Sequence, residues 1–170
     1  CIKGLLTDHY NPVTKTVNLS EGVYHGANVA AAAVAAHECG HAVQHATAYG
    51  PLGMRSALVP VVQFSSNWVT WIILGGLLLL GTNAGQVMLL IGIVLYGMIT
   101  LFSFITLPVE VNASQRAVNW LQEAGITNRE TTEMASDALH SAAYTYVVAA
   151  LSSLATLVYY ILIFMGGNRR

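Results

Sequence analysis

The segment 37–41 reads His-Glu-Cys-Gly-His, which is the pattern H-E-x-x-H. On a helix, His37 and His41 lie about one turn apart on the same face, so both imidazoles can bind a single ion. Zinc prefers nitrogen ligands in a tetrahedral shell and keeps one position open in catalytic sites. Glu38 lies beside that face, where it could take a proton from a zinc-activated water and pass it to a leaving amine. The pattern therefore predicts a zinc centre that hydrolyses peptide bonds.

A third protein ligand is needed, and two residues compete for this role. His45 lies one turn after His41, but one straight helix cannot wrap three consecutive turns around one tetrahedral ion. The extended pattern H-E-x-x-H-x-x-G-x-x-H would need a histidine at position 47, which is Thr47. Glu110 follows a long apolar segment, where a carboxylate needs a partner. We favour Glu110 as the third ligand over an ordinary ion pair with a nearby arginine.

The composition indicates that these residues belong to a membrane protein. Hydrophobic residues make up 55% of the 170 residues, charged residues only 9%, and the mean hydropathy is +0.57. A soluble domain carries roughly 25% charged residues, so this chain is too poor in charge to cover a water-facing surface. The net charge of −1 and the lack of a Lys/Arg cluster argue against a nucleic-acid partner. Membrane lipid and a peptide or membrane-protein substrate are the expected partners.

We expect one mainly α-helical, membrane-embedded domain, with a small β-hairpin in its first 20 residues. The alanine-rich segment 28–48 predicts one helix that carries the H-E-x-x-H pattern and stops at Gly50-Pro51. Three uncharged segments are long enough to cross a bilayer. These predicted spans are about 58–80, 87–107 and 142–165. The catalytic part would then comprise residues 1–57 and 108–141.

The first two spans are joined by a short link, which returns the chain to the side of the membrane where it started. The helix 28–48 and Glu110 are therefore expected in the same compartment. Five of the seven Lys and Arg residues lie on that side, and Arg169 and Arg170 lie opposite. The positive-inside rule then favours a cytoplasmic active site.

Four segments carry a resemblance to a known family: 6–12, 37–44, 55–60 and 107–114. They resemble the YugP-like family of neutral zinc metallopeptidases, and more distantly the HtpX heat-shock protease and the CAAX prenyl protease. The resemblance implies a zinc peptidase in a bacterial cell membrane with its site facing the cytoplasm. Family members usually carry an extra N-terminal membrane helix, and this chain begins with Cys1, so we expect further residues before it.

In the distant relatives, the ligand glutamate is followed by a motif that ends in Ala-Asp, whose aspartate braces a zinc-binding histidine. Here Ala113 is followed by Ser114. Asn112 or Ser114 could replace that aspartate as a neutral partner of a histidine ligand. By the same resemblance, the run 17–19 could be an edge strand that pairs with an extended substrate, although an ordinary hairpin is an equal alternative.

Other residues have weaker signals. His140 could donate to the oxyanion of a tetrahedral intermediate, and so, less strongly, could Tyr144 or Tyr146. Anchoring at the bilayer interface is the competing explanation for the tyrosines. Cys39 is expected to be a small core residue that faces away from the metal.

Two other functions remain open from the sequence. If the helix 28–48 lay within the bilayer, the chain would be an intramembrane protease of the site-two type, but the helix is only weakly hydrophobic and no later Leu-Asp-Gly supplies a carboxylate. Several histidines and a glutamate at the membrane edge could also mark a metal transporter or metal sensor without protease activity. Segment 87–107 offers only small hydroxyls for such transport.

Overall fold

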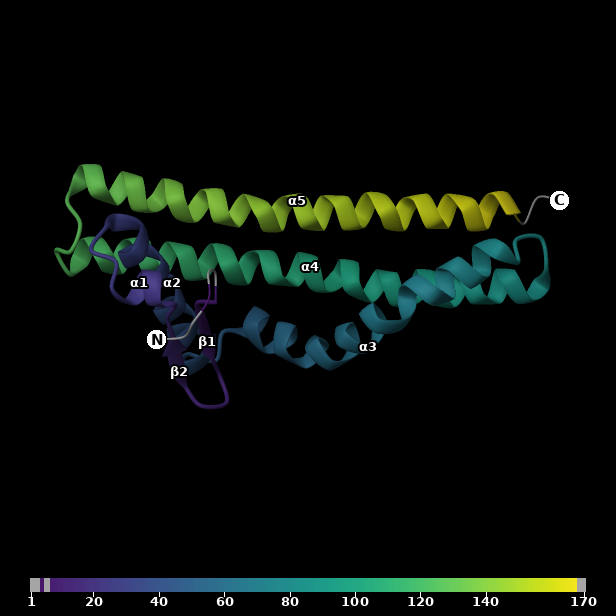
Figure 1. Cartoon of the computed structure of the whole chain (residues 1–170), viewed down its shortest axis with the longest axis horizontal. Helices are drawn as coiled ribbons and strands as arrows, with labels where there is room; N and C mark the ends of the chain where they lie inside the picture. Colours follow the sequence, from purple (N-terminus) through teal and green to yellow (C-terminus); the bar gives the residue numbers. More distant parts are fainter. Residues whose placement is uncertain (1–3, 5–6, 168–170) are drawn as a thin grey trace. The chain divides into compact units, whose positions relative to one another are not determined.

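The computed structural model describes residue 4 and residues 7–167. It is mainly helical, with one two-stranded sheet, as the sequence predicts (Figure 1). In chain order the elements are β1 (His9–Asn11), β2 (Thr16–Asn18), α1 (Glu21–Tyr24), α2 (Val29–Ala46), α3 (Gly50–Leu78), α4 (Asn83–Glu123) and α5 (Arg129–Gly167).

Strands β1 and β2 form the predicted hairpin, an antiparallel pair in which Tyr10 lies opposite Val17. The Asn11 side chain makes the turn, because its oxygen accepts the backbone N–H groups of Val13 and Thr14 at 2.9 and 3.2 Å. The first strand begins at His9. Residues 5 and 6 lie outside the described residues.

Helix α2 begins at an Asn28 cap, whose side chain accepts the backbone N–H of Ala31 at 2.8 Å. It ends at Ala46, because Ala48 has a φ of +49° and a left-handed residue cannot continue the helix. The predicted stop at Gly50-Pro51 is instead the start of α3. A proline in the first turn of a helix lacks only an N–H that would have no partner there.

Contacts along the chain define two compact units. Unit 1 comprises Cys1–Gly53 and Leu107–Thr145, and unit 2 comprises Met54–Thr106 and Tyr146–Arg170. The long helices α4 and α5 each contribute residues to both units. That the chain is one domain stays a prediction.

The core of unit 1 is built from small residues of α2, α4 and α5, among them Ala33, Ala117 and Ala135. Their short side chains allow the helices to approach closely. At Gly40 the approach is so close that an added Cβ atom would stand only 2.7 Å from the carbonyl oxygen of Ala113. The alanine and glycine content of α2 thus brings the H-E-x-x-H pattern against α4.

Unit 2 has a narrow core around Val69, Ile73 and Leu89, which lie on α3 and α4. Many of its large apolar side chains are exposed, for example Trp71 and Val94. Within the described part of the chain, α3, α4 and α5 are long and apolar enough to cross a membrane. Helix α4 continues through Pro108, although that proline removes one backbone hydrogen bond.

Candidate metal centre

Three side chains from α2 and α4 converge within unit 1. His37 and His41 lie one turn apart on α2, and Glu110 faces them from α4. One ligand atom of each lies within 4.8 Å of the others. Glu110 Oε2 lies 3.2 Å from His37 Nε2 and 3.5 Å from His41 Nε2. The structure therefore brings together the three residues that the sequence suggested as ligands.

The geometry of this cluster fits a zinc ion. Zinc bonds to histidine nitrogens and carboxylate oxygens are about 2.0–2.2 Å long, so two ligands of a tetrahedral shell lie roughly 3.3–3.5 Å apart. The two distances to Glu110, 3.2 and 3.5 Å, are close to that spacing. Two imidazoles and one carboxylate are also the ligand set of a catalytic zinc with one open position.

Glu110 is almost completely buried, with only 3% of the residue exposed. A buried carboxylate needs a compensating positive charge. Burial of His41 lowers its pKa, but the hydrogen bond and the charge of Glu110 outweigh that effect and raise the pKa above the ordinary value of 6.5. The cluster thus favours a cation, either a proton on His41 or a metal ion.

Both histidines have partners for their second ring nitrogen. His37 Nδ1 lies 3.1 Å from the hydroxyl of Ser114, and His41 Nδ1 lies 3.0 Å from Gln44 Oε1. Both Nε2 atoms then point toward Glu110. Ser114 thus lies where a neutral partner of His37 is expected, whereas Asn112 accepts a hydrogen bond from Gln44, which in turn contacts His41.

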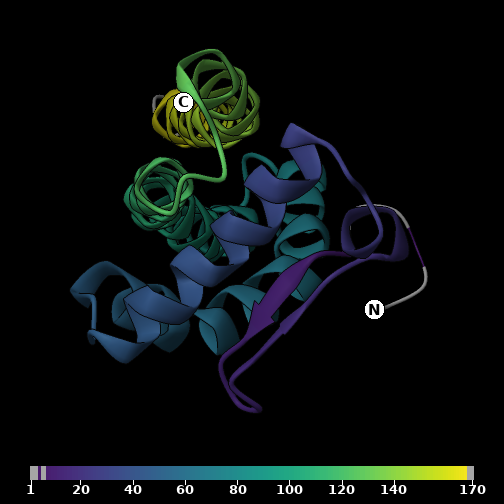
Figure 2. The ribbon, with the colours of Figure 1, turned by 90° about the vertical axis from the view of Figure 1, so that its left-hand side faces the viewer.

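The hairpin packs against α2 (Figure 2), and Glu38 of α2 contacts it. Glu38 is buried, and its Oε2 accepts the backbone N–H of Tyr10 at 2.9 Å. Tyr10 also contacts His45, because its Oη lies 2.8 Å from His45 Nδ1. His45 is therefore engaged with the hairpin and does not belong to the cluster of His37, His41 and Glu110.

The strand that touches Glu38 is β1, and the run 17–19 covers most of its partner strand. Sequence reasoning did not find Tyr10, because 28 residues separate it from Glu38. It also missed Gln44, although a polar residue three positions after His41 on the same helix face is a readable signal.

His140 lies on α5 in unit 1. Its Nδ1 is 3.3 Å from the Ser136 hydroxyl, and it lines a cavity of about 210 Å³ together with Ser114. Its catalytic role, and that of Tyr144 or Tyr146, stays a prediction. Cys39, in contrast, is exposed, so the expectation of a core residue was wrong. It lies at the side of α2 where a cavity opens toward α4.

The sequence of the chain is similar to those of known proteins. The chain is 42% identical over 167 residues to a Bacillus subtilis (strain 168) protein called "Putative membrane protease YugP", covering 98% of this chain and 72% of that protein. No solved structure matches. Residues 1–165 match the family described as "Putative neutral zinc metallopeptidase". The chain therefore belongs to this family.

Proposed function

We propose that the chain is a zinc-dependent, membrane-bound endopeptidase. In this proposal His37, His41 and Glu110 hold the zinc ion and Glu38 is the general base. The observation that carries the proposal is the convergence of the three ligand atoms within 4.8 Å of one another, next to the buried Glu38 in sequence, with both histidines close to tetrahedral spacing from Glu110. Family membership supports the same activity.

A zinc ion held here would polarise a peptide carbonyl and acidify a water molecule. Glu38 would accept a proton from that water and deliver it to the leaving amine. The backbone N–H of Tyr10 restrains one oxygen of the Glu38 carboxylate, which leaves the other oxygen to handle the proton. The buried position of Glu38 strengthens these electrostatic effects relative to water.

The substrate class in this proposal is a peptide segment of a membrane protein or of a protein close to the membrane. Three helices able to cross a bilayer would keep the site near the membrane. We place the chain in a bacterial cell membrane with the site on the cytoplasmic side, because most Lys and Arg residues lie on the side of the motif helix.

The decisive test is Glu38→Gln, with Glu130→Gln as the control at an exposed position. Purified proteins in detergent are incubated with a mixture of unstructured peptides, and cleavage is followed by mass spectrometry beside the zinc content. We expect Glu38→Gln to keep its zinc and to lose about 100- to 10,000-fold of the cleavage rate. Unchanged cleavage would refute the role of Glu38. Metal transport into vesicles without any cleavage by the wild type would instead favour a transporter.

A further inference from the structure

A chain of polar contacts, buried at His41 and partly buried at its other end, leads from His41 on α2 to Arg116 on α4. Gln44 is fully buried, and its Oε1 lies 3.0 Å from His41 Nδ1. Its amide nitrogen donates to the backbone carbonyl of Val109 at 2.8 Å and to Asn112 Oδ1 at 3.0 Å. Asn112 Oδ1 also accepts a hydrogen bond from Arg116 Nε at 2.8 Å. Four side chains thus form one continuous path.

The direction of every bond in this path follows from its last member. The guanidinium of Arg116 can only donate, so Asn112 must present its oxygen. That oxygen and the Val109 carbonyl can only accept, so both must face the NH₂ group of Gln44. The Gln44 oxygen is then left for His41, and the hydrogen between them must sit on His41 Nδ1. In the neutral ring, Nε2 consequently keeps its lone pair.

This result matters because His41 Nε2 is the atom that faces Glu110. Only a nitrogen with a free lone pair can bind a metal ion, and a second partner on the other nitrogen fixes the ring orientation. His37 differs in this respect. Its Nδ1 meets the Ser114 hydroxyl, which can donate or accept, so this contact does not select a tautomer.

We propose that Gln44, oriented by Asn112 and Arg116, is a positioning residue that holds His41 in its metal-binding tautomer. This inference rests on the proposed function, in which His41 is a zinc ligand. Arg116 thereby sets the state of a ligand that it does not touch.

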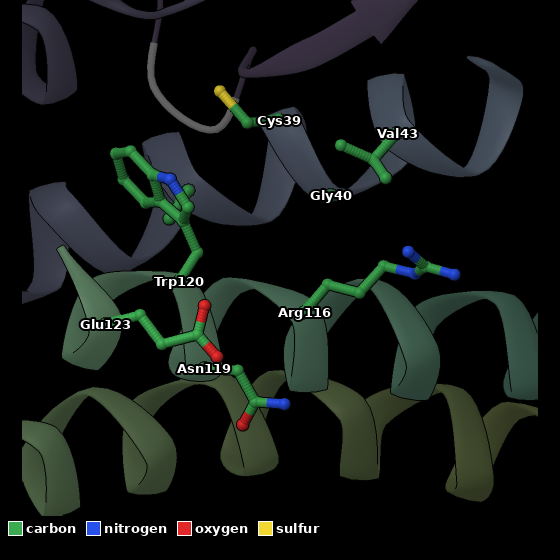
Figure 3. Close-up of a pocket in the computed structure, with 8 residues that line it drawn as sticks. Cys39, Gly40, Val43, Arg116, Asn119, Trp120 and Glu123 are labelled. Carbon is green, nitrogen blue, oxygen red and sulfur yellow. The ribbon is translucent and has the colours of Figure 1, made fainter. Parts of the chain in front are cut away.

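The Arg116 end of the path is accessible. Arg116 lines a cavity of about 300 Å³ between α2 and α4 in unit 1, with Cys39, Val43 and Trp120 among its other walls (Figure 3). Asn119 lines the same cavity from α4 and is exposed. Within the described residues its side chain makes no hydrogen bond, so it offers a matched control on the same helix. Substitutions at this end spare the buried core.

The first measurement is the zinc affinity of the full chain in detergent, by competition with a chromogenic chelator. Gln44→Met keeps the length of the side chain but removes both kinds of hydrogen bond, and we expect affinity to fall about 10- to 100-fold. For Arg116→Met we expect a smaller loss, up to about tenfold. Arg116→Lys keeps a donor and should restore most of the affinity, and Asn119→Ala should leave it unchanged.

The second measurement reads the tautomer directly. Long-range ¹H–¹⁵N spectra of the zinc-free protein at alkaline pH, where the imidazoles are neutral, should show His41 with its hydrogen on Nδ1. Arg116→Met should give a mixture of tautomers, and Arg116→Lys should not. This readout does not depend on peptidase activity, and thermal unfolding of each zinc-free variant shows whether it is folded.

These experiments distinguish failure of the proposed zinc-peptidase function from failure of the positioning role of Gln44. A wild type that binds no zinc defeats the proposed function. A wild type that binds zinc, together with folded Gln44→Met and Arg116→Met variants of equal affinity, overturns the positioning role alone. If Gln44→Met does not fold, the Arg116 variants decide: a wild-type tautomer in Arg116→Met overturns the role, and a mixture supports it.

Discussion

The two units of this chain bury different kinds of polar residue. Unit 1 buries charged and amide side chains, including Glu38, Gln44 and Glu110, and each has a hydrogen-bond partner or an ionic partner. Among the described residues of unit 2, the buried polar side chains are all hydroxyls, such as those of Ser65 and Thr100. Hydroxyls can bond to the carbonyl one turn earlier, as Ser65 does at 2.8 Å to Val61.

Exposed large apolar side chains occur in both units, but most of those in the described residues belong to unit 2. Large apolar side chains such as Trp71, Val94 and Leu162 are exposed on unit 2, and in water such a surface would be costly. A lipid environment removes that cost but makes every unpaired polar group expensive. The comparison teaches that one continuous chain can keep its ionic chemistry in one unit and its lipid-compatible surface in the other. Four predictions test this division.

The largest effect is expected at the ionic centre of unit 1. Glu110→Ala removes the only carboxylate of the three-residue cluster, so we expect zinc affinity to fall by at least about 100-fold. Wild type should hold about one zinc ion per chain. His45→Ala is the control, because His45 binds Tyr10 and should leave zinc content unchanged. Both are measured by elemental analysis of purified protein, and the reverse pattern would make His45 the third ligand.

The ligand cluster and the long helices were predictable from the sequence, whereas the contacts of the hairpin were not. The H-E-x-x-H pattern and the apolar segments predict the ligand cluster and the three long helices, because both signals are local and periodic. The contact of Tyr10 with Glu38 was not predictable in the same way, since it depends on how a hairpin packs on α2. Cys39 was misplaced because helix periodicity shows which way a residue points, but not whether another element covers that face.

A second prediction concerns packing. In Gly40→Ala the added Cβ would stand 2.7 Å from a backbone oxygen of Ala113, which cannot move aside as a flexible side chain would. We expect a destabilisation of about 1–3 kcal/mol and weaker zinc binding. Gly97→Ala in unit 2 is the control, because nothing lies within 4 Å of its added atom. Thermal release of zinc in detergent measures both, and equal release temperatures would contradict the close contact of α2 with α4.

The third prediction probes the hydroxyl chemistry of unit 2. Thr100 and Ser153 join α4 to α5 through a buried hydroxyl pair with an oxygen–oxygen distance of 2.7 Å. Hydrogen bonds between membrane helices contribute about 0.6 kcal/mol on average, so Thr100→Val should shift the unfolding equilibrium in mixed micelles by roughly threefold. Ser103→Ala is the control, because within the described part of the chain the Ser103 hydroxyl bonds only to the Ile99 carbonyl of its own helix. A loss as large as that of Gly40→Ala would mean that unit 2 depends on polar contacts after all.

The smallest expected effect is a change in the reactivity of Cys39, which reports on the aqueous character of unit 1. Partial burial, and after it the negative charge of Glu38, raise the pKa of the Cys39 thiol. Glu38→Gln removes the second cause, so the thiolate fraction at neutral pH should rise. Alkylation by a membrane-impermeant maleimide, in a Cys1→Ser background, should therefore become slightly faster, by less than the threefold change expected for Thr100→Val.

A cysteine introduced at the exposed apolar position Val94 of unit 2, with Cys39 replaced by serine, should stay unlabelled in intact membranes. Labelling of Val94→Cys together with protection of Cys39 would reverse the assignment of water to unit 1 and lipid to unit 2.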